Sequence, residues 1–319
     1  MEPTGLVVER AARAKPTWRD LRHRWDTRYA PYAYIAPYFL LFSVFGLFPL
    51  LYTAWVSLQD RNLLDGDAAT FIGVDNYVRL LTADPYFWNA MGNTLSLWLL
   101  TTVPQILFAL GIAQLLNRRL RGRTFFRMGV LLPNITSVAA VTIIFAQLFG
   151  RDFGLVNWVL ELFDAGRVDW QAGTASSHTA IAAMVVWRWT GYHALIFLAS
   201  MQAIPSSVYE AARLDGANSW QQFWRITVPM LRPQIIFSTV IATAGNMRLL
   251  AEPLLFNPGT AASTGGSDRQ FQTAALYLYE QGFGKFDFGY ASAIAWLLLI
   301  ATVLITGLSY LAARRIRTD

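Results

Sequence analysis

The sequence predicts an all-α membrane protein with six transmembrane helices. Of its 319 residues, 55% are hydrophobic and only 14% are charged, whereas soluble domains average about 45–50% apolar and about 25% charged residues. Six separated apolar stretches each approach the roughly 20 residues that a helix needs to cross a bilayer. Lys and Arg are concentrated in alternate connecting segments, as expected for a chain that crosses the membrane repeatedly.

The spans follow one another along nearly the whole chain. We place them at residues 33–57, 90–116, 128–149, 178–202, 234–256 and 290–312. The fifth contains Gly245 and Pro253, which make an interruption of its helix plausible. The predicted organisation is a cytoplasmic tail, residues 1–30, followed by one six-span domain, residues 31–319.

The distribution of positive charge predicts the orientation. Residues 1–30, 117–127, 203–233 and 313–319 hold 18 of the 26 Lys and Arg residues, and the alternate loops hold six. Because cytoplasmic loops carry the excess of Lys and Arg, both termini are predicted to be cytoplasmic. The net charge of +6 therefore reflects topology and predicts no nucleic-acid partner. Residues 1–30 lack the apolar region and cleavage site of a removable signal peptide.

Several chemistries are excluded by composition. The chain has no Cys, which excludes disulfides, thiolate metal sites and Cys nucleophiles. Its two lysines, Lys15 and Lys285, are followed by Pro and Phe, so neither belongs to a phosphate-binding P-loop. Three widely spaced histidines give no metal-ligand pattern. We therefore predict a chain that is no enzyme and has no cofactor or metal of its own.

The cytoplasmic loop 203–233 is the most informative segment. Ser207 with Glu210 fits a capping box that opens a helix, and Gly216 lies where a left-handed C-terminal cap belongs. Ser219 with Gln222 repeats the capping signal, and Pro229 limits the second helix. The loop is therefore predicted to form two short helices with a Gly hinge at the membrane surface.

Such a hairpin is more than a connector requires. Ala211 and Ala212 offer a small face that another protein surface could approach closely. Alternatively, Trp220, Phe223 and Trp224 place an amphipathic hairpin among lipid headgroups. The residues themselves leave both interpretations open.

A longer pattern in this loop distinguishes them. Glu210-Ala211-Ala212-x3-Gly216-x9-Ile226-x-Val228-Pro229 resembles the E-A-A-x3-G-x9-I-x-L-P loop of binding-protein-dependent ABC importer permeases, with Val228 in place of the usual Leu. The string Glu-Ala-Ala-Arg-Leu-Asp-Gly-Ala, residues 210–217, resembles the carbohydrate-uptake (maltose/disaccharide) branch. Residues 71–77, 132–133 and 154–157 are similar to further segments of that family, so the resemblance covers roughly residues 35–315.

The resemblance implies a type I ABC importer transmembrane domain that moves a di- or oligosaccharide across a bacterial inner membrane. It implies four kinds of partner: a second homologous permease subunit, an ABC ATPase dimer holding ATP and Mg, an extracytoplasmic sugar-binding protein and membrane lipid. It also implies that the loop couples to the ATPase through Glu210, Ala211, Ala212, Asp215 and Gly216.

Polar residues within the spans are candidates for the substrate pathway. In span five, Arg248 and Glu252 are four apart, so they share a helix face and can pair. Asn246 faces elsewhere unless the helix is interrupted. Three roles remain open for this group: a lining of the pathway, a structural ion pair, or a solvated Glu252 at the outer interface.

In span four, Arg188 and Tyr192 are four apart, as are Trp189 and His193. A cation–π contact would lower the cost of burying Arg188. We include Arg188, Trp189 and Tyr192 among the pathway candidates, with packing between spans as the alternative.

For each of two loops, two roles remain open. The Arg-rich loop 118–127 is a topology determinant near lipid phosphates or a contact with the ATPase, and the loop 259–267 is a flexible connector or a contact for a partner. For the whole protein, the alternative to an importer subunit is an ATPase-independent secondary transporter or channel, which would use the intramembrane Arg and Glu as an ion relay.

Overall fold

The computed structural model describes residues 18, 25–26, 29–64, 66, 69–118, 121–257, 259 and 262–315. The predicted tail 1–30 lies almost entirely outside the described residues, as do Arg119, Thr260, Ala261 and the last four residues of the chain. The chain divides into two compact units, Met1–Trp55 and Val56–Asp319, which are described separately.

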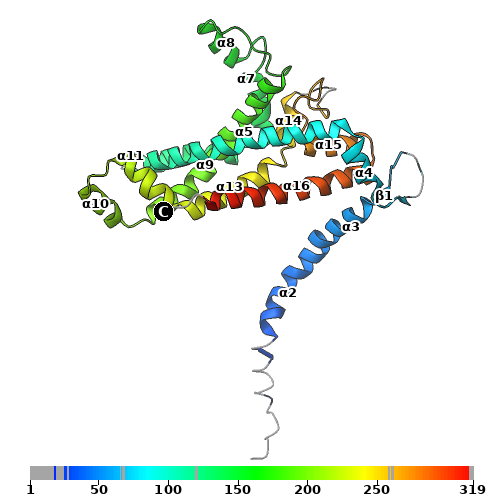
Figure 1. Ribbon diagram of the computed structural model, residues 1–319, viewed down its shortest axis with the longest axis horizontal. Helices are drawn as coiled ribbons and strands as arrows, with labels where there is room; N and C mark the ends of the chain where they lie inside the picture. The colour runs from blue at the N-terminus through cyan, green and yellow to red at the C-terminus, as the bar shows by residue number, and fades with distance from the viewer. Residues whose placement is uncertain are drawn as a thin grey trace, which may run out of the picture. The chain divides into compact units, whose positions relative to one another are not determined.

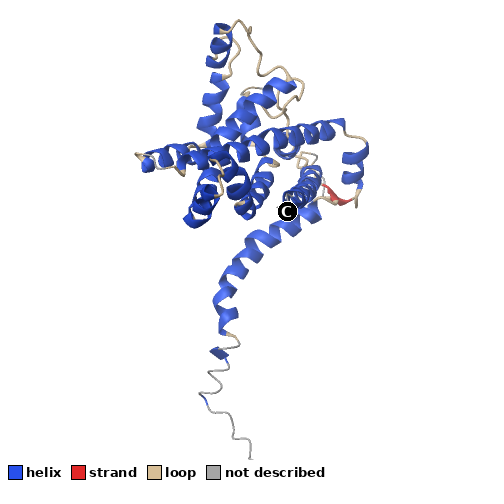
Figure 2. Cartoon of the chain, turned by 60° about the vertical axis from the view of Figure 1, so that its left-hand side comes forward, coloured by secondary structure: helices blue, strands red, loops and turns tan. Residues whose placement is uncertain are grey.

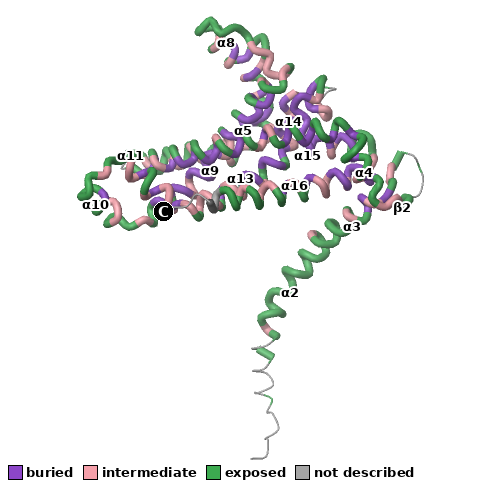
Figure 3. Tube along the Cα trace, in the orientation of Figure 1, coloured by how far each residue is buried: buried purple, intermediate pink, exposed green. Residues whose placement is uncertain are grey.

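The first unit contains one long apolar helix. It begins as α2 (Ala30–Phe42), passes through the π-helical turn η1 (Ser43–Leu47) and ends as α3 (Phe48–Val56), whose last residue belongs to the second unit. Almost all of its side chains are exposed (Figure 3). A helix that is apolar all round fits a surrounding of lipid or of other protein helices.

In the second unit, α5 (Pro85–Leu116) packs along α9 (Thr174–Gln202), and α13 (Arg232–Asn246) packs on α16 (Phe288–Arg315), as Figure 1 shows. Small residues permit the close packing, since Ala109, Ala113 and Ala194 are fully buried in one core cluster. Predicted spans two, four and six are therefore confirmed as single helices. With the helix of the first unit, four described helices are long and apolar enough to cross a membrane, or up to six spans if each bent pair counts as one.

The third predicted span is bent rather than straight. Helix α6 (Arg123–Ile135) and helix α7 (Val138–Leu148) meet at 93°, so a single straight helix over 128–149 is wrong. Pro133 removes a hydrogen-bond donor in the last turn of α6, and Thr136 is extended. Helix α6 crosses α9 so closely that a Cβ on Gly191 would lie 1.8 Å from the carbonyl oxygen of Val130. Glycine is therefore required at that crossing.

The fifth predicted span is interrupted. Helix α13 ends at Asn246, and helix α14 (Ala251–Phe256) begins after the non-helical residues 247–250. A bend of 69° separates α13 from the helical segment Ser219–Met230 before it. The interruption confirms the expectation attached to Gly245 and Pro253.

Short elements complete the fold, which Figure 2 shows to be helical apart from one small hairpin. Strands β1 (Gln59–Asp60) and β2 (Thr70–Phe71) pair antiparallel, with Gln59 opposite Phe71. The remaining elements outside the loop 203–233 are α4 (Asp75–Thr82), α8 (Leu155–Leu162), α15 (Ala274–Tyr279) and the π turn η3 (Glu280–Gly284).

Two of the segments that resemble the importer family have a structural role. The Asn76 amide donates to the carbonyl oxygens of Ser57 and Gln59, both at 3.0 Å, and so holds the hairpin. The Asn157 amide donates to the carbonyl oxygen of Val168 at 2.8 Å and so closes the loop after α8. Each buried Asn replaces regular backbone pairing at an irregular turn.

Candidate functional site

A cavity of about 620 Å³ lies beside the break between α13 and α14. Its wall combines residues of α5, α7 and α9 with residues of the interrupted fifth span. Five of the six predicted pathway residues line it: Arg188, Trp189, Asn246, Arg248 and Glu252. Tyr192 does not line it; its ring packs edge-on against the rings of Trp189 and His193.

The ionic contact in this wall joins two spans. Arg188 Nη1 lies 3.7 Å from Glu252 Oε1, and both side chains are largely buried. The Arg188 guanidinium also lies 5.4 Å from the centre of the Trp189 ring, which supplies the expected cation–π contact. Glu252 is only 6% exposed, so it is not a solvated interface carboxylate within this chain.

The predicted pair between Arg248 and Glu252 is wrong. Because the helix breaks at residues 247–250, the two side chains no longer share a face. Arg248 is exposed, and its Nε donates to the carbonyl oxygen of Ala244 at 2.8 Å, where α13 ends. Within the described ranges Arg248 forms no ion pair, so its guanidinium is available at the cavity wall.

Asn246 connects the break to α5. Its amide donates to Thr102 Oγ1 at 2.9 Å and to Gln105 Oε1 at 3.4 Å. Sequence reasoning missed Thr102 and Gln105, although polar residues within an apolar span are a usable signal. Arg188 Nε and His193 Nδ1 are buried and have no hydrogen-bond partner among the described residues. The wall therefore offers hydrogen-bonding groups that the chain itself does not satisfy.

The loop 203–233 folds into two helical parts separated by a glycine. Helix α10 (Ser206–Leu214) is followed by Asp215 and then Gly216, whose φ of +82° confirms the left-handed cap. Both predicted capping boxes are wrong. Helix α10 begins at Ser206, after Pro205, without a side-chain cap, and the box of the second helix is formed by Asn218 and Gln221, which exchange hydrogen bonds of 2.9 Å.

The second helical part continues farther than expected. Helix α11 (Ser219–Gln222) passes through the π turn η2 (Phe223–Thr227) into α12 (Val228–Met230), so Pro229 does not stop it. The wider π turn changes which carbonyl each N–H reaches and so accommodates the missing donor of Pro229. Tyr209 Oη lies 2.9 Å from Thr227 Oγ1 and ties α10 to this turn. We call residues 206–230 the coupling hairpin.

Four of the five predicted coupling residues lie on the exposed side of the coupling hairpin. Glu210, Ala211, Asp215 and Gly216 are exposed. Ala212 is buried within the hairpin, so only Ala211 offers a small exposed face. The large apolar side chains of Leu214 and Trp220 are 91% and 70% exposed. Exposed apolar groups beside a helix end indicate a surface that another molecule covers.

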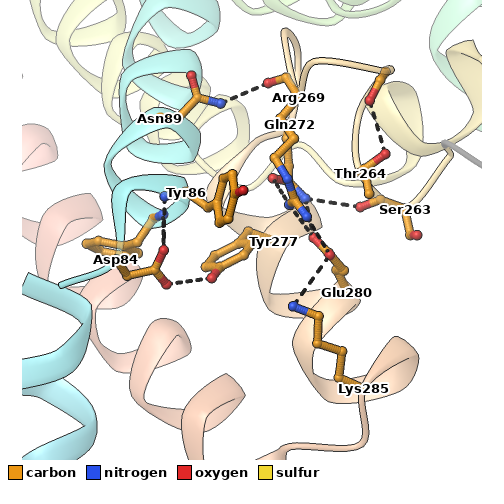
Figure 4. A network of polar contacts seen from close by, with 12 residues as sticks. Asp84, Tyr86, Asn89, Ser263, Thr264, Arg269, Gln272, Tyr277, Glu280 and Lys285 are labelled. Atoms are coloured by element: carbon orange, nitrogen blue, oxygen red, sulfur yellow. Dashed lines mark hydrogen bonds and ion pairs between the residues drawn. The ribbon is translucent and has the colours of Figure 1, made fainter.

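A second polar network lies at the opposite end of α5, where sequence reasoning placed no site (Figure 4). Asp84 Oδ2 accepts hydrogen bonds from the hydroxyls of Tyr277 at 2.5 Å and Tyr290 at 2.6 Å, and Asp84 Oδ1 accepts from the backbone N–H groups of Tyr86 and Phe87. Burial opposes ionisation, but these bonds outweigh it and hold the pKa of Asp84 below its ordinary value. The sequence signal was an Asp before Pro at the start of a helix.

Beside it, Arg269 anchors the segment before α15. Its guanidinium donates to both oxygens of Glu280, at 2.6 and 2.8 Å, and Asn89 and Asn93 donate to its carbonyl oxygen at 2.9 Å. Desolvation opposes the charge on Glu280, yet the hydrogen bonds from Arg269 and Gln272 hold its pKa below the ordinary value. The network therefore fixes this segment to α5 and η3.

Interrupted apolar helices beside a cavity with a few polar side chains are typical of membrane transport proteins. A family model supports that class and refines it. The chain belongs to the family described as binding-protein-dependent transport system inner membrane component, whose model matches residues 77–318.

The relatives are permeases of known transport systems. The chain is 34% identical to the lactose transport system permease protein LacF of Rhizobium radiobacter, over 88% of this chain and 93% of LacF. It is 33% identical to the arabinooligosaccharides transport system permease protein AraP of Bacillus subtilis (96% and 95%). It is 32% identical to the trehalose/maltose transport system permease protein MalF of Thermococcus litoralis (90% and 94%).

Solved structures share the fold. A chain of a bacterial alginate ABC transporter, in complex with an alginate pentasaccharide-bound periplasmic protein, superposes with a TM-score of 0.77 at 22% identity, over 95% of this chain and 98% of that chain. A second structure of a bacterial ABC transporter that imports alginate gives a TM-score of 0.74 at 23% identity (94% and 99%). The expected type I permease fold is therefore confirmed.

Proposed function

We propose that this chain is the permease subunit of an ATP-driven ABC importer that passes a di- or oligosaccharide from an extracytoplasmic binding protein to the cytoplasm. The observation that carries the proposal is the cavity at the α13–α14 break. Its volume of about 620 Å³ lies within the range of about 300–1,000 Å³ typical of small-molecule sites. The lactose, arabinooligosaccharide and trehalose/maltose systems of the relatives support a saccharide as the cargo.

The chemistry of the wall suits a saccharide. Sugar hydroxyls need both donors and acceptors, which Arg188, Asn246 and Glu252 provide. The indole of Trp189 adds a flat apolar surface against which a pyranose ring can pack. In this proposal Arg188 and Glu252 orient each other across the wall and exchange part of their mutual contact for contacts with hydroxyls.

The coupling hairpin is the proposed contact with the ATPase partner. We propose that Glu210, Ala211, Asp215 and Gly216 dock on an ABC ATPase dimer, which holds ATP and Mg, and that the buried Ala212 supports this face from within the hairpin. The exposed side chains at the end of α10 support this assignment. A second homologous permease completes the pathway, and both termini lie in the cytoplasm of a bacterial cell.

Reconstitution tests the proposal. The chain is purified with its second permease and ATPase, placed in proteoliposomes with ATP inside, and supplied with the binding protein and radiolabelled saccharides. We expect uptake that requires both ATP and the binding protein. Uptake that persists without the ATPase and collapses with the ion gradient would support a secondary transporter instead.

A further inference from the structure

Two arginines of α6 converge on one amide at the end of α9. With its oxygen turned toward them, the Gln202 side chain accepts hydrogen bonds from Nη2 of Arg127, at 2.6 Å, and from Nη2 of Arg123. Arg123 and Arg127 are four residues apart on α6, so both face the same neighbour. Neither forms an ion pair with an acidic side chain in the part of the chain that the structure describes.

If this arrangement served only to pack α6 against α9, its electrostatic free energy would be unfavourable. Two positive side chains at this spacing repel each other, and a neutral amide offsets the repulsion less than a carboxylate would. The carbonyl groups at the C-terminal end of α9 add favourable negative potential. The site therefore holds two cations around an acceptor that binds them only moderately, and Gln202 is exposed, so water can replace the contact.

Gln202 lies between the coupling hairpin and the helices that reach the cavity. Gln202 is the last residue of α9, and α10 of the coupling hairpin begins at Ser206. On the other side of the contact, α6 leads through the 93° bend into α7, whose Val138 lines the cavity. Gln202 thus joins the base of the coupling hairpin to the helix pair that forms part of the cavity wall.

We infer that Gln202 is a positioning residue that passes movement of the coupling hairpin to α6 and α7 through its bonds to Arg123 and Arg127. The inference rests on the proposed function and adds to it a route within this chain. Coupling between distant sites is carried by hydrogen bonds and packed elements that adopt two arrangements. A neutral, water-exchangeable acceptor allows this contact to open and re-form in each transport cycle.

Two substitutions at Gln202 distinguish a role in transmitting movement from a role in stabilising the fold. Gln202→Leu removes the acceptor, so ATP hydrolysis continues while fewer saccharide molecules are moved per ATP. We expect that ratio to fall by at least about fivefold, the lower end of usual coupling factors. Gln202→Glu strengthens the contact, so transport and ATP hydrolysis both slow while the ratio stays at the wild-type value.

The assay measures saccharide uptake and phosphate release together in proteoliposomes containing the full complex. Arg121→Gln is the matched control, since it removes a positive charge from the same exposed segment but not from the contact. It should keep the wild-type ratio. A control that lowers the ratio as much as Gln202→Leu would overturn the inference in favour of a lipid or ATPase contact of the basic loop.

The outcomes distinguish the two proposals. A wild-type ratio for Gln202→Leu, with only a lower yield or thermal stability of the complex, would show a supporting role and overturn the inference alone. Absence of ATP-dependent uptake by the wild-type complex would overturn the proposed function and the inference together. If Gln202→Leu does not assemble, Arg127→Gln, which leaves the Arg123 contact, should lower the ratio by a smaller factor, and an unchanged ratio refutes the inference.

Discussion

Replacing Asp84 by Ala tests the polar network at the start of α5. The Asp84 carboxylate accepts four hydrogen bonds, two from buried tyrosine hydroxyls and two from backbone N–H groups in the first turn of the helix. It thereby joins α5 to α15 and α16. Alanine removes all four acceptor contacts and leaves Tyr277 and Tyr290 without this partner.

The expected loss follows from these contacts. Each buried hydroxyl left unsatisfied costs about 1–3 kcal/mol, and loss of an N-terminal cap costs about 0.5–2 kcal/mol. Together the free energy of unfolding should fall by about 2.5–8 kcal/mol. Asp84→Asn keeps one acceptor oxygen for the cap and turns an NH2 donor toward the tyrosine hydroxyls, which can accept from it, so it should cost less; Tyr277→Phe should cost least because it removes a single donor.

Thermal unfolding of the detergent-purified protein, followed by its tryptophan fluorescence, measures the effect. The matched control is Asp152→Ala, since Asp152 is exposed and such substitutions change stability by about 0.5 kcal/mol or less. An Asp84→Ala midpoint no lower than that of the control would refute the reasoning. Because the folded pKa of Asp84 is lowered, its stabilisation is complete above the unfolded pKa of about 3.9 and is lost as the pH falls through the folded value.

Three further predictions concern the crossing, the cavity and the coupling hairpin. Gly191→Ala should lower stability by about 1–3 kcal/mol or more, because the new Cβ meets the backbone of Val130; Gly111→Ala, with open space around it, should not lower it in the same melting assay. Glu252→Gln should reduce saccharide uptake more than the amount of assembled complex, and unchanged uptake kinetics would assign Glu252 a structural role. Gly216→Pro should abolish uptake while the membrane level stays normal, because a φ of +82° is closed to proline; normal uptake, or normal uptake by Glu210→Lys, would contradict the coupling assignment.

The helices could be predicted from the sequence because burial in lipid demands long apolar runs. The spans that became α5, α9 and α16 matched their predicted ranges closely for this reason. The left-handed Gly216 was also predictable, since it depends on local backbone chemistry. The capping boxes were not predictable in this way. Helix α10 begins after Pro205 without a side-chain cap, and Asn218 rather than its neighbour Ser219 caps the second helix, because Asn and Ser have similar capping preferences.

Partners in the cavity were harder to predict because they depend on tertiary structure. A four-residue spacing implies a shared face only while the helix continues, and the break at residues 247–250 sent Glu252 to Arg188 and left Arg248 at the end of α13. Irregular backbone within a membrane span is tolerated only where it is buried in protein or lines a cavity, and residues 248–250 line the cavity. The interruption for which the spacing rule fails therefore also forms part of the cavity wall, and Gly245 and Pro253, which lie on either side of it, are the residues of the sequence that indicated it.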